Sequence, residues 1–284
     1  MGAARPEGLK PLVSTGELAA QLASWRIFDC RHDLARPDWG EEEFRKAHLP
    51  GARFAHLDRD LSAPKTGKNG RHPLPDPANF SAWLGAHGLK RSDRVACYDA
   101  GNGTMAARLW WMLRWIGHDA VAVLDGGLAR WVAEKRPLTP EIMEFPRSNF
   151  PARVRPGLEV KVDFVESNPG QDLLLDARAP ARFRGEQEPI DPVAGRIPGA
   201  QNRFCTENLA ADGSFKSSSV LRAEFLKLLG NTGPSHVIHY CGSGVAACHN
   251  LLAMEIAGLA GSRLYAGSWS EWIADPRRKL VRGG

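Results

Sequence analysis

Short apolar runs recur along the chain, and each ends in an aspartate or a tyrosine. Runs of this length are typical of strands that are buried on both faces of a parallel sheet. The intervening segments place apolar side chains three or four residues apart, as in helices that pack on a sheet. The predicted strands cover residues 25–29, 94–98, 173–176 and 237–240, and two predicted helices cover residues 105–116 and 247–259. This alternation predicts an α/β protein with parallel sheets that helices cover on both faces.

The chain contains the same pattern twice. IFDCRHD, with its later LPGA, matches LLLDARA, with its later IPGA, and VACYDAGNG matches VIHYCGSGV. The matched positions lie 141 to 148 residues apart, namely Asp29 with Asp176, Pro50 with Pro198, Asp99 with Cys241, and Trp131 with Trp272. A period as long as a whole domain indicates a duplicated domain rather than a stacked solenoid.

Prolines separate the two copies. Pro137, Pro140, Pro146, Pro151 and Pro156 disfavour both a helix and a central strand. We therefore predict a first domain at residues 1–140, a linker at 141–157 and a second domain at 158–284. A length of 284 residues suits two domains of ordinary size.

Composition excludes several classes of protein. The net charge of +5 is spread along the chain except for a basic tail, and without a nucleic-acid motif we expect no nucleic-acid partner. No stretch has the ~18 to 20 apolar residues of a membrane span, and the start lacks a secretory core. We expect a soluble, cytoplasmic protein that does not contact a membrane. Five irregularly spaced cysteines suit neither a disulfide framework nor a zinc cluster, and no motif predicts a cofactor or a metal.

The candidate chemistry follows the strand at residues 237–240, where Cys241 opens the loop CGSGV before a helix. Open α/β sheets bind ligands at the carboxyl ends of strands, and the N–H groups of a helix start favour an anion. Gly242 and Gly244 allow the backbone to curl around the sulfur. Such a cradle would hold a thiolate and an attached sulfane sulfur. The backbone positions expected to bind the donor are Gly242, Gly244, Val245 and Ala246.

Two alternatives concern the thiols. Cys241 could be a buried structural cysteine, but the strand-to-helix junction and the duplicated loop favour a reactive one. Cys248, about two helical turns further on, is more readily a core thiol than a resolving cysteine. The first copy carries Asp99 in place of Cys241. A carboxylate does not accept a sulfur atom, so we predict that the first domain is catalytically silent.

The two halves, the paired LPGA and IPGA turns, the DGG and AGSW endings and the CGSGVAA loop resemble the tandem-domain rhodanese superfamily. The loop itself is similar to that of 3-mercaptopyruvate sulfurtransferases. The resemblance covers nearly the whole chain and implies two tandem rhodanese-like domains. It also implies that Cys241 takes a sulfur atom from a small-molecule donor as a persulfide. The acceptors implied are cyanide, a thiol or a thioredoxin-like protein.

The resemblance also implies roles for other side chains. Ser243, His72 and Asp58 match the residues that handle protons in these enzymes, although His72 could be an ordinary loop histidine and Ser243 a helix cap. Arg182 matches the arginine that binds the substrate carboxylate. Where the family has a second arginine, this chain has Ile190. Arg196 is a candidate replacement, with a structural or surface role as the alternative.

The donor and the reaction class remain to be distinguished. Thiosulfate sulfurtransferases usually have an arginine and a lysine after the cysteine, whereas this loop offers Gly242 and Ser243. Losing two charges matters more for a dianion than for a monoanionic keto acid, so we predict 3-mercaptopyruvate as donor and retain thiosulfate as the alternative. A phosphatase of the Cys-x5-Arg type would need arginine at position 247, which is Ala247. A non-catalytic binding module is disfavoured by Cys241.

Overall fold

The computed structural model describes residues 9–168 and 170–283, which form two compact units. The described part of unit 1 covers residues 9–63, 75–155 and 211–214. Unit 2 covers residues 64–74, 156–168, 170–210 and 215–283. Each unit therefore includes one short segment from the other half of the sequence: residues 211–214 belong to unit 1 and residues 64–74 to unit 2. A division of the chain at a single boundary does not separate the units in this way.

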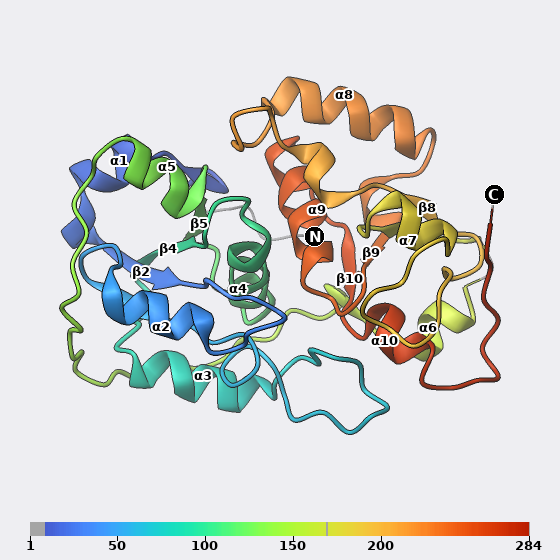
Figure 1. Ribbon diagram of the computed structural model, residues 1–284, viewed down its shortest axis with the longest axis horizontal. Helices are drawn as coiled ribbons and strands as arrows, with labels where there is room; N and C mark the ends of the chain where they lie inside the picture. The colour runs from blue at the N-terminus through green and yellow to red at the C-terminus, as the bar shows by residue number, and fades with distance from the viewer. Residues whose placement is uncertain (1–8, 169, 284) are drawn as a thin grey trace. The chain divides into compact units, whose positions relative to one another are not determined.

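Unit 1 is built on a five-stranded parallel sheet in the order β1-β5-β4-β2-β3; Figure 1 labels its three middle strands, β5, β4 and β2. Its strands are β1 (Leu12–Val13), β2 (Trp25–Asp29), β3 (Ala52–Phe54), β4 (Arg94–Tyr98) and β5 (Val121–Leu124). Its helices are α1 (Thr15–Ala20), α2 (Trp39–Lys46), α3 (Pro77–Ala86), α4 (Thr104–Trp115) and α5 (Gly127–Ala133), with a 3₁₀ turn at Leu22–Ser24. Helix α4 packs on β4 and β5, and its tryptophans at positions 110, 111 and 115 are buried, as expected of core residues.

Unit 2 repeats this arrangement with the order β6-β10-β9-β7-β8, also parallel throughout. Its strands are β6 (Glu159–Val160), β7 (Leu173–Asp176), β8 (Gln201–Asn202), β9 (Val237–Tyr240) and β10 (Arg263–Tyr265). Its helices are α6 (Val162–Glu166), α7 (Pro180–Arg184), α8 (Ser218–Leu229), α9 (Ala246–Ile256) and α10 (Ser268–Trp272), with 3₁₀ turns at Cys205–Asn208 and Pro234–His236. The predicted α/β class with two parallel sheets flanked by helices is confirmed.

The duplication extends to buried polar contacts. In unit 1 the Asp29 carboxylate binds the backbone N–H and guanidinium of Arg31, and it accepts a hydrogen bond of 2.6 Å from the Tyr98 hydroxyl. In unit 2 Asp176 binds Arg178 in the same way. A buried charge needs a partner of this kind, so these pairs hold the carboxyl ends of β2 and β7 in place.

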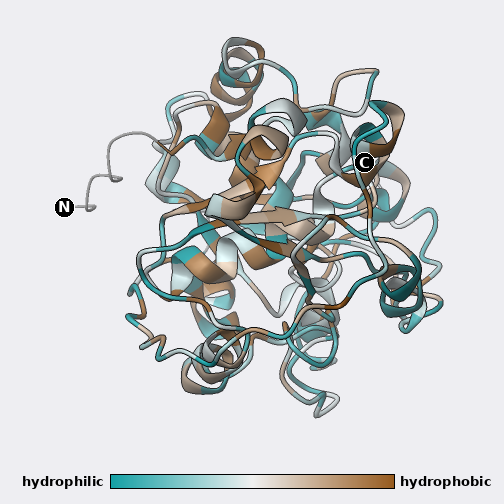
Figure 2. Cartoon of the chain, turned by 90° about the vertical axis from the view of Figure 1, so that its left-hand side faces the viewer, coloured by the Kyte–Doolittle hydropathy of each residue, from teal (hydrophilic) through white to brown (hydrophobic). Residues whose placement is uncertain are grey.

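Hydrophobic residues are frequent on the central strands, while many outer loops are hydrophilic (Figure 2). Ile27, Ala96 and Ala122 belong to the core cluster of unit 1, and Leu174 and Ile238 to that of unit 2. Residues 140–155 contain no helix or strand, as their prolines predict. Among residues 9–168 and 170–283, no helix is both long and apolar enough to cross a bilayer.

Candidate active site

Cys241 is buried at the carboxyl end of β9, five residues before α9 begins. Its Sγ accepts a hydrogen bond of 3.1 Å from the backbone N–H of Gly244. Its own N–H donates to the Ser268 hydroxyl at 3.1 Å, and its carbonyl accepts from the N–H of Trp269 at 3.0 Å. The loop is therefore tied to the start of α10, and one of its amides already points at the sulfur.

Gly244 is required at its position for two reasons. Its φ of +76° lies in the left-handed region, and a Cβ atom there would come within 2.3 Å of the Ala266 carbonyl oxygen. Gly242 has no such backbone constraint. A Cβ on Gly242 would instead lie 2.9 Å from Nη2 of Arg71 and 3.5 Å from Nη2 of Arg182. The position after Cys241 is thus small because two guanidinium groups lie against it.

The corresponding loop of unit 1 contains an anion. The Asp99 carboxylate accepts hydrogen bonds of 2.9 to 3.2 Å from four backbone N–H groups, those of Gly101, Gly103, Met105 and Ala106. Successive N–H groups after a strand and at a helix start form an anion-binding concavity. A loop of this type binds negative charge, and in unit 1 that charge is the carboxylate of Asp99, a residue of the loop itself.

The structure brings His72 and Ser243 together within unit 2. His72 Nδ1 lies 2.8 Å from the Ser243 hydroxyl, and both side chains are buried. His72 reaches this place because Pro64–Leu74 belongs to unit 2. Asp58, the third residue of the predicted relay, belongs to unit 1, where its carboxylate lies 3.9 Å from His32 Nε2. Its part in the relay stays a prediction.

Arg182 and Arg71 share a carboxylate. Arg182 donates to Glu188 at 2.6 Å and to Asp191 at 3.0 Å, and Arg71 forms an ion pair with the other oxygen of Asp191. The two acidic side chains are almost fully buried, whereas the side chains of Arg182 and Arg71 are 16% and 22% exposed. The buried carboxylates therefore position the two arginines, whose side chains remain partly exposed.

Arg71 was not predicted as a site residue. The loop after Cys241 is uncharged, as predicted, but two guanidinium groups lie beside it. Ile190, at the position of the expected second arginine, is 45% exposed, and the adjacent Asp191 binds Arg71 instead. The signal for Arg71 was its place directly before His72 in GRHPLP.

Arg196 contacts the C-terminal segment. Its backbone pairs with Val281, its Nη1 donates to the Gly283 carbonyl at 2.5 Å, and its guanidinium lies over the Phe183 ring at 4.6 Å. These contacts favour the structural alternative for Arg196. Val245 precedes α9 as its cap residue, and Ala246 is the first residue of that helix.

The other four thiols are buried. The Cys248 thiol donates to the Gly244 carbonyl at 3.3 Å, so it supports the loop from behind. Burial raises the pKa of Cys205 to about 12 and also raises the pKa values of Cys30 and Cys97. A thiol with a raised pKa is a poor nucleophile, which agrees with structural roles for these three.

The duplicated loop is also visible in comparisons with known proteins. The model of the Rhodanese-like domain matches residues 14–134 and again residues 163–275. The chain belongs to the rhodanese-like family. Its two matches confirm the predicted duplication and the predicted resemblance to tandem rhodanese domains.

Relatives that match most of this chain carry the names of sulfurtransferases. A Pseudomonas aeruginosa protein named "Probable 3-mercaptopyruvate sulfurtransferase" is 47% identical over 96% of this chain and 98% of its own length. A Mycobacterium tuberculosis protein that carries the name of a thiosulfate sulfurtransferase is 37% identical over 96% of this chain and 97% of its own. The structure of 3-mercaptopyruvate sulfurtransferase from Leishmania major has a TM-score of 0.84 and 33% identity, and it covers 95% of this chain and 75% of that one. The predicted assignment to the sulfurtransferases is confirmed.

Proposed function

We propose that the protein transfers a sulfur atom from 3-mercaptopyruvate to a thiol or cyanide acceptor through a persulfide on Cys241. The observation that carries this proposal is the hydrogen bond from the Gly244 N–H to Cys241 Sγ, in a buried loop at the end of β9. A charge-assisted hydrogen bond of this kind stabilises a thiolate. Asp99 supports the same view, because its carboxylate occupies the equivalent loop of unit 1.

In the first half-reaction the Cys241 thiolate attacks the sulfur of the donor. A sulfur–sulfur bond forms as the carbon–sulfur bond breaks, and the electron pair of the broken bond remains on the donor carbon as the enolate of pyruvate. The proton of the donor thiol moves to that carbon, so the products are pyruvate and a deprotonated persulfide. The number of protons and electrons on the two sides is equal.

The Ser243 and His72 pair handles this proton in the proposal. Their distance of 2.8 Å is that of a hydrogen bond, and general acid–base catalysis needs such reach. The Ser243 hydroxyl takes the proton of the donor thiol while it passes its own to His72, and the direction reverses when the enolate is protonated. Asp58 is proposed to orient His72, as the family resemblance implies.

Arg182 and Arg71 bind the donor carboxylate in this proposal. Both guanidinium groups lie against Gly242, next to the nucleophile, and a guanidinium can bind a carboxylate through two parallel hydrogen bonds. Glu188 and Asp191 balance the two positive charges. A site with no excess of positive charge favours a monoanion over a dianion, and this supports mercaptopyruvate over thiosulfate as the donor. The balanced arginines add this argument to the one from the uncharged loop.

In the second half-reaction an acceptor anion attacks the outer sulfur of the persulfide. The sulfur–sulfur bond breaks, its electron pair returns to Cys241 as a thiolate, and the acceptor leaves as a persulfide or, from cyanide, as thiocyanate. We propose a thiol of the cytoplasm, including that of a thioredoxin-like protein, as the natural acceptor.

The test combines mass and kinetics. After incubation with 3-mercaptopyruvate, the intact protein should gain about 32 Da at Cys241, and Cys241→Ser should gain nothing and turn over no donor. A Cys241→Ser variant that turns over normally, or a modified Cys248 with an unmodified Cys241, would overturn the proposal.

Thiosulfate is the second candidate donor, because two guanidinium groups lie beside the loop and the Mycobacterium tuberculosis relative carries that name. The two donors are compared by kcat/KM on one preparation. A higher kcat/KM with thiosulfate would transfer the assignment to a thiosulfate sulfurtransferase and leave the persulfide mechanism intact.

A further inference from the structure

Arg53 is a buried cation in unit 1 that lacks a carboxylate partner. It lies on the edge strand β3, is 5% exposed, and donates from Nε to the His87 carbonyl at 2.7 Å and from Nη1 to the Gly51 carbonyl at 3.3 Å. The Phe145 ring covers one face of the guanidinium, 3.2 Å from its central carbon. Among the residues that the structure describes, none forms an ion pair with Arg53 or accepts a hydrogen bond from Nη2.

This arrangement differs from that of two other buried arginines, Arg31 and Arg178. Arg31 and Arg178 each bind a buried aspartate, as a charge in the protein interior requires. Burial, together with the nearby positive charge of Arg26, lowers the pKa of Arg53 to about 10, and the negative charge of Asp93 offsets only part of this effect. Within the described residues 9–168 and 170–283, the Arg53 guanidinium therefore has no ion-pair partner, and an anion from outside the chain could supply one.

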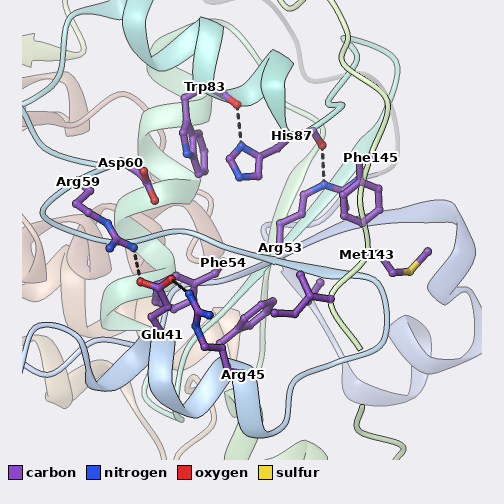
Figure 3. A pocket seen from close by; sticks show the side chains of 13 residues that line it. Glu41, Arg45, Arg53, Phe54, Arg59, Asp60, Trp83, His87, Met143 and Phe145 are labelled. Atoms are coloured by element: carbon purple, nitrogen blue, oxygen red, sulfur yellow. Dashed lines mark hydrogen bonds and ion pairs between the residues drawn. The ribbon is translucent and has the colours of Figure 1, made fainter. Parts of the chain in front are cut away.

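A cavity of about 310 Å³ opens onto Arg53 (Figure 3). Its walls are largely apolar and come from α2, β3, α3 and residues 142–145; they include Phe54, Trp83, Met143 and Phe145. Ile142 and Met143 at this cavity are 57% and 49% exposed, an unusual state for two adjacent apolar side chains. A volume of this size, with aromatic side chains and a few charged groups in the lining, is typical of small-ligand sites.

The charges around the cavity leave one positive charge in excess. Arg45 and Arg59 both bind Glu41, at one side of the cavity in Figure 3, and Asp60 is the second acid in the lining. Three arginines therefore face two carboxylates, and the arginine without an ion pair is Arg53. This balance suits a ligand with a single negative charge, since a dianion would lack a second cation.

We propose that this cavity binds a small monoanionic carboxylate with an aromatic or branched apolar body, about the size of an indole or a naphthalene ring system. The carboxylate accepts hydrogen bonds from the Arg53 guanidinium, and the apolar body packs against Trp83, Met143 and Phe145. The site lies wholly in unit 1, so it is independent of the chemistry proposed for Cys241.

The test is calorimetric binding of 1-naphthoate and indole-3-acetate to the full chain, with 1-naphthalenemethanol as the uncharged analogue. For ligands of this size we expect 1:1 binding with a Kd of about 1 mM or tighter. The alcohol should bind at least about tenfold more weakly, because it forms no charge-assisted bond. Equal binding of alcohol and carboxylate, or no binding of either acid, would refute the proposal.

Variants locate the binding. Arg53→Gln should weaken naphthoate at least about tenfold. Met143→Glu, at an exposed position of the lining, should weaken it similarly by repulsion, whereas Met143→Gln should bind like the parent protein. Leu138→Glu, on another partly exposed residue that does not line the cavity, is the charge control. If Arg53→Gln does not fold, the two Met143 variants still decide, and an unchanged Kd in Met143→Glu would contradict the site.

Discussion

Gly242→Ala tests the placement of the two arginines without altering either of them. The backbone at Gly242 is outside the left-handed region, so alanine causes no strain there. The new Cβ would lie 2.9 Å from Nη2 of Arg71, whereas ordinary contacts begin at 3.4 Å, so the guanidinium must move by at least the difference of 0.5 Å. The Arg182 guanidinium, at 3.5 Å, needs no comparable shift.

A shift of this size lengthens a normal hydrogen bond to the limit at which it is lost. A hydrogen bond to a charged group contributes about 1.5 to 3 kcal/mol, and 1.4 kcal/mol corresponds to tenfold in kcat/KM. We therefore expect kcat/KM for 3-mercaptopyruvate to fall by about tenfold to a hundredfold, mainly through KM. Stability should be unchanged or slightly higher, because alanine restricts the unfolded chain more than glycine does.

The assay is steady-state kinetics with 3-mercaptopyruvate together with a urea unfolding curve. Gly233→Ala is the matched control, since Gly233 lies in unit 2, has φ of −69° and would place its Cβ where nothing lies within 4 Å. If Gly242→Ala keeps the parent kcat/KM within a factor of about two while it folds normally, Arg71 does not bind the donor from its place against Gly242 and the reasoning fails.

Three further results are expected. Gly244→Ala should lower the unfolding free energy by about 1 to 3 kcal/mol, measured by urea, because it forces a left-handed side chain against the Ala266 carbonyl; an unaltered midpoint would contradict the loop geometry. Asp191→Asn should raise the ratio of kcat/KM for thiosulfate to kcat/KM for mercaptopyruvate, because it leaves Arg71 and Arg182 with one positive charge in excess. A constant ratio would exclude charge balance as the cause of the donor preference. Burial lowers the pKa of His239 from 6.5 to about 3, so below about pH 6.5 the unfolded chain binds a proton that the folded chain refuses. Unfolding free energy should therefore fall from pH 7 to pH 5, and His239→Phe should reduce that slope; equal slopes in the two proteins would exclude His239 as its source.

The four predicted strands all lie in the interior of a sheet, whereas the interior strands β5 and β10 were not predicted. The bounds of β2, β4, β7 and β9 agree with the apolar runs, because a strand covered on both faces must be apolar throughout. The edge strands β1, β6 and β8 contain two residues each, too few to show any pattern. Their pairing depends on neighbours distant in the sequence.

The site divides in the same way between local and distant contacts. Cys241 and Gly244 could be found from the sequence because a strand end, a glycine turn and a helix start are adjacent in the chain. Ser243 and His72 lie 171 residues apart, and only the family resemblance suggested that they meet. For Arg71 the one signal was its place directly before His72. Its position follows from the inclusion of Pro64–Leu74 in unit 2, which no local pattern encodes.

Asp99 can be considered as a ligand that the chain carries on itself. A diffusing anion must reach a sufficient concentration to fill a cradle of four N–H groups, whereas a tethered carboxylate is present at an effective concentration of millimolar or above. The N–H groups of the unit 1 loop are therefore already occupied by the Asp99 carboxylate, which a free anion would have to displace. Replacing Asp99 with alanine would remove this carboxylate and leave the four N–H groups open. The affinity of that loop for small anions would then measure how strongly the loop binds negative charge.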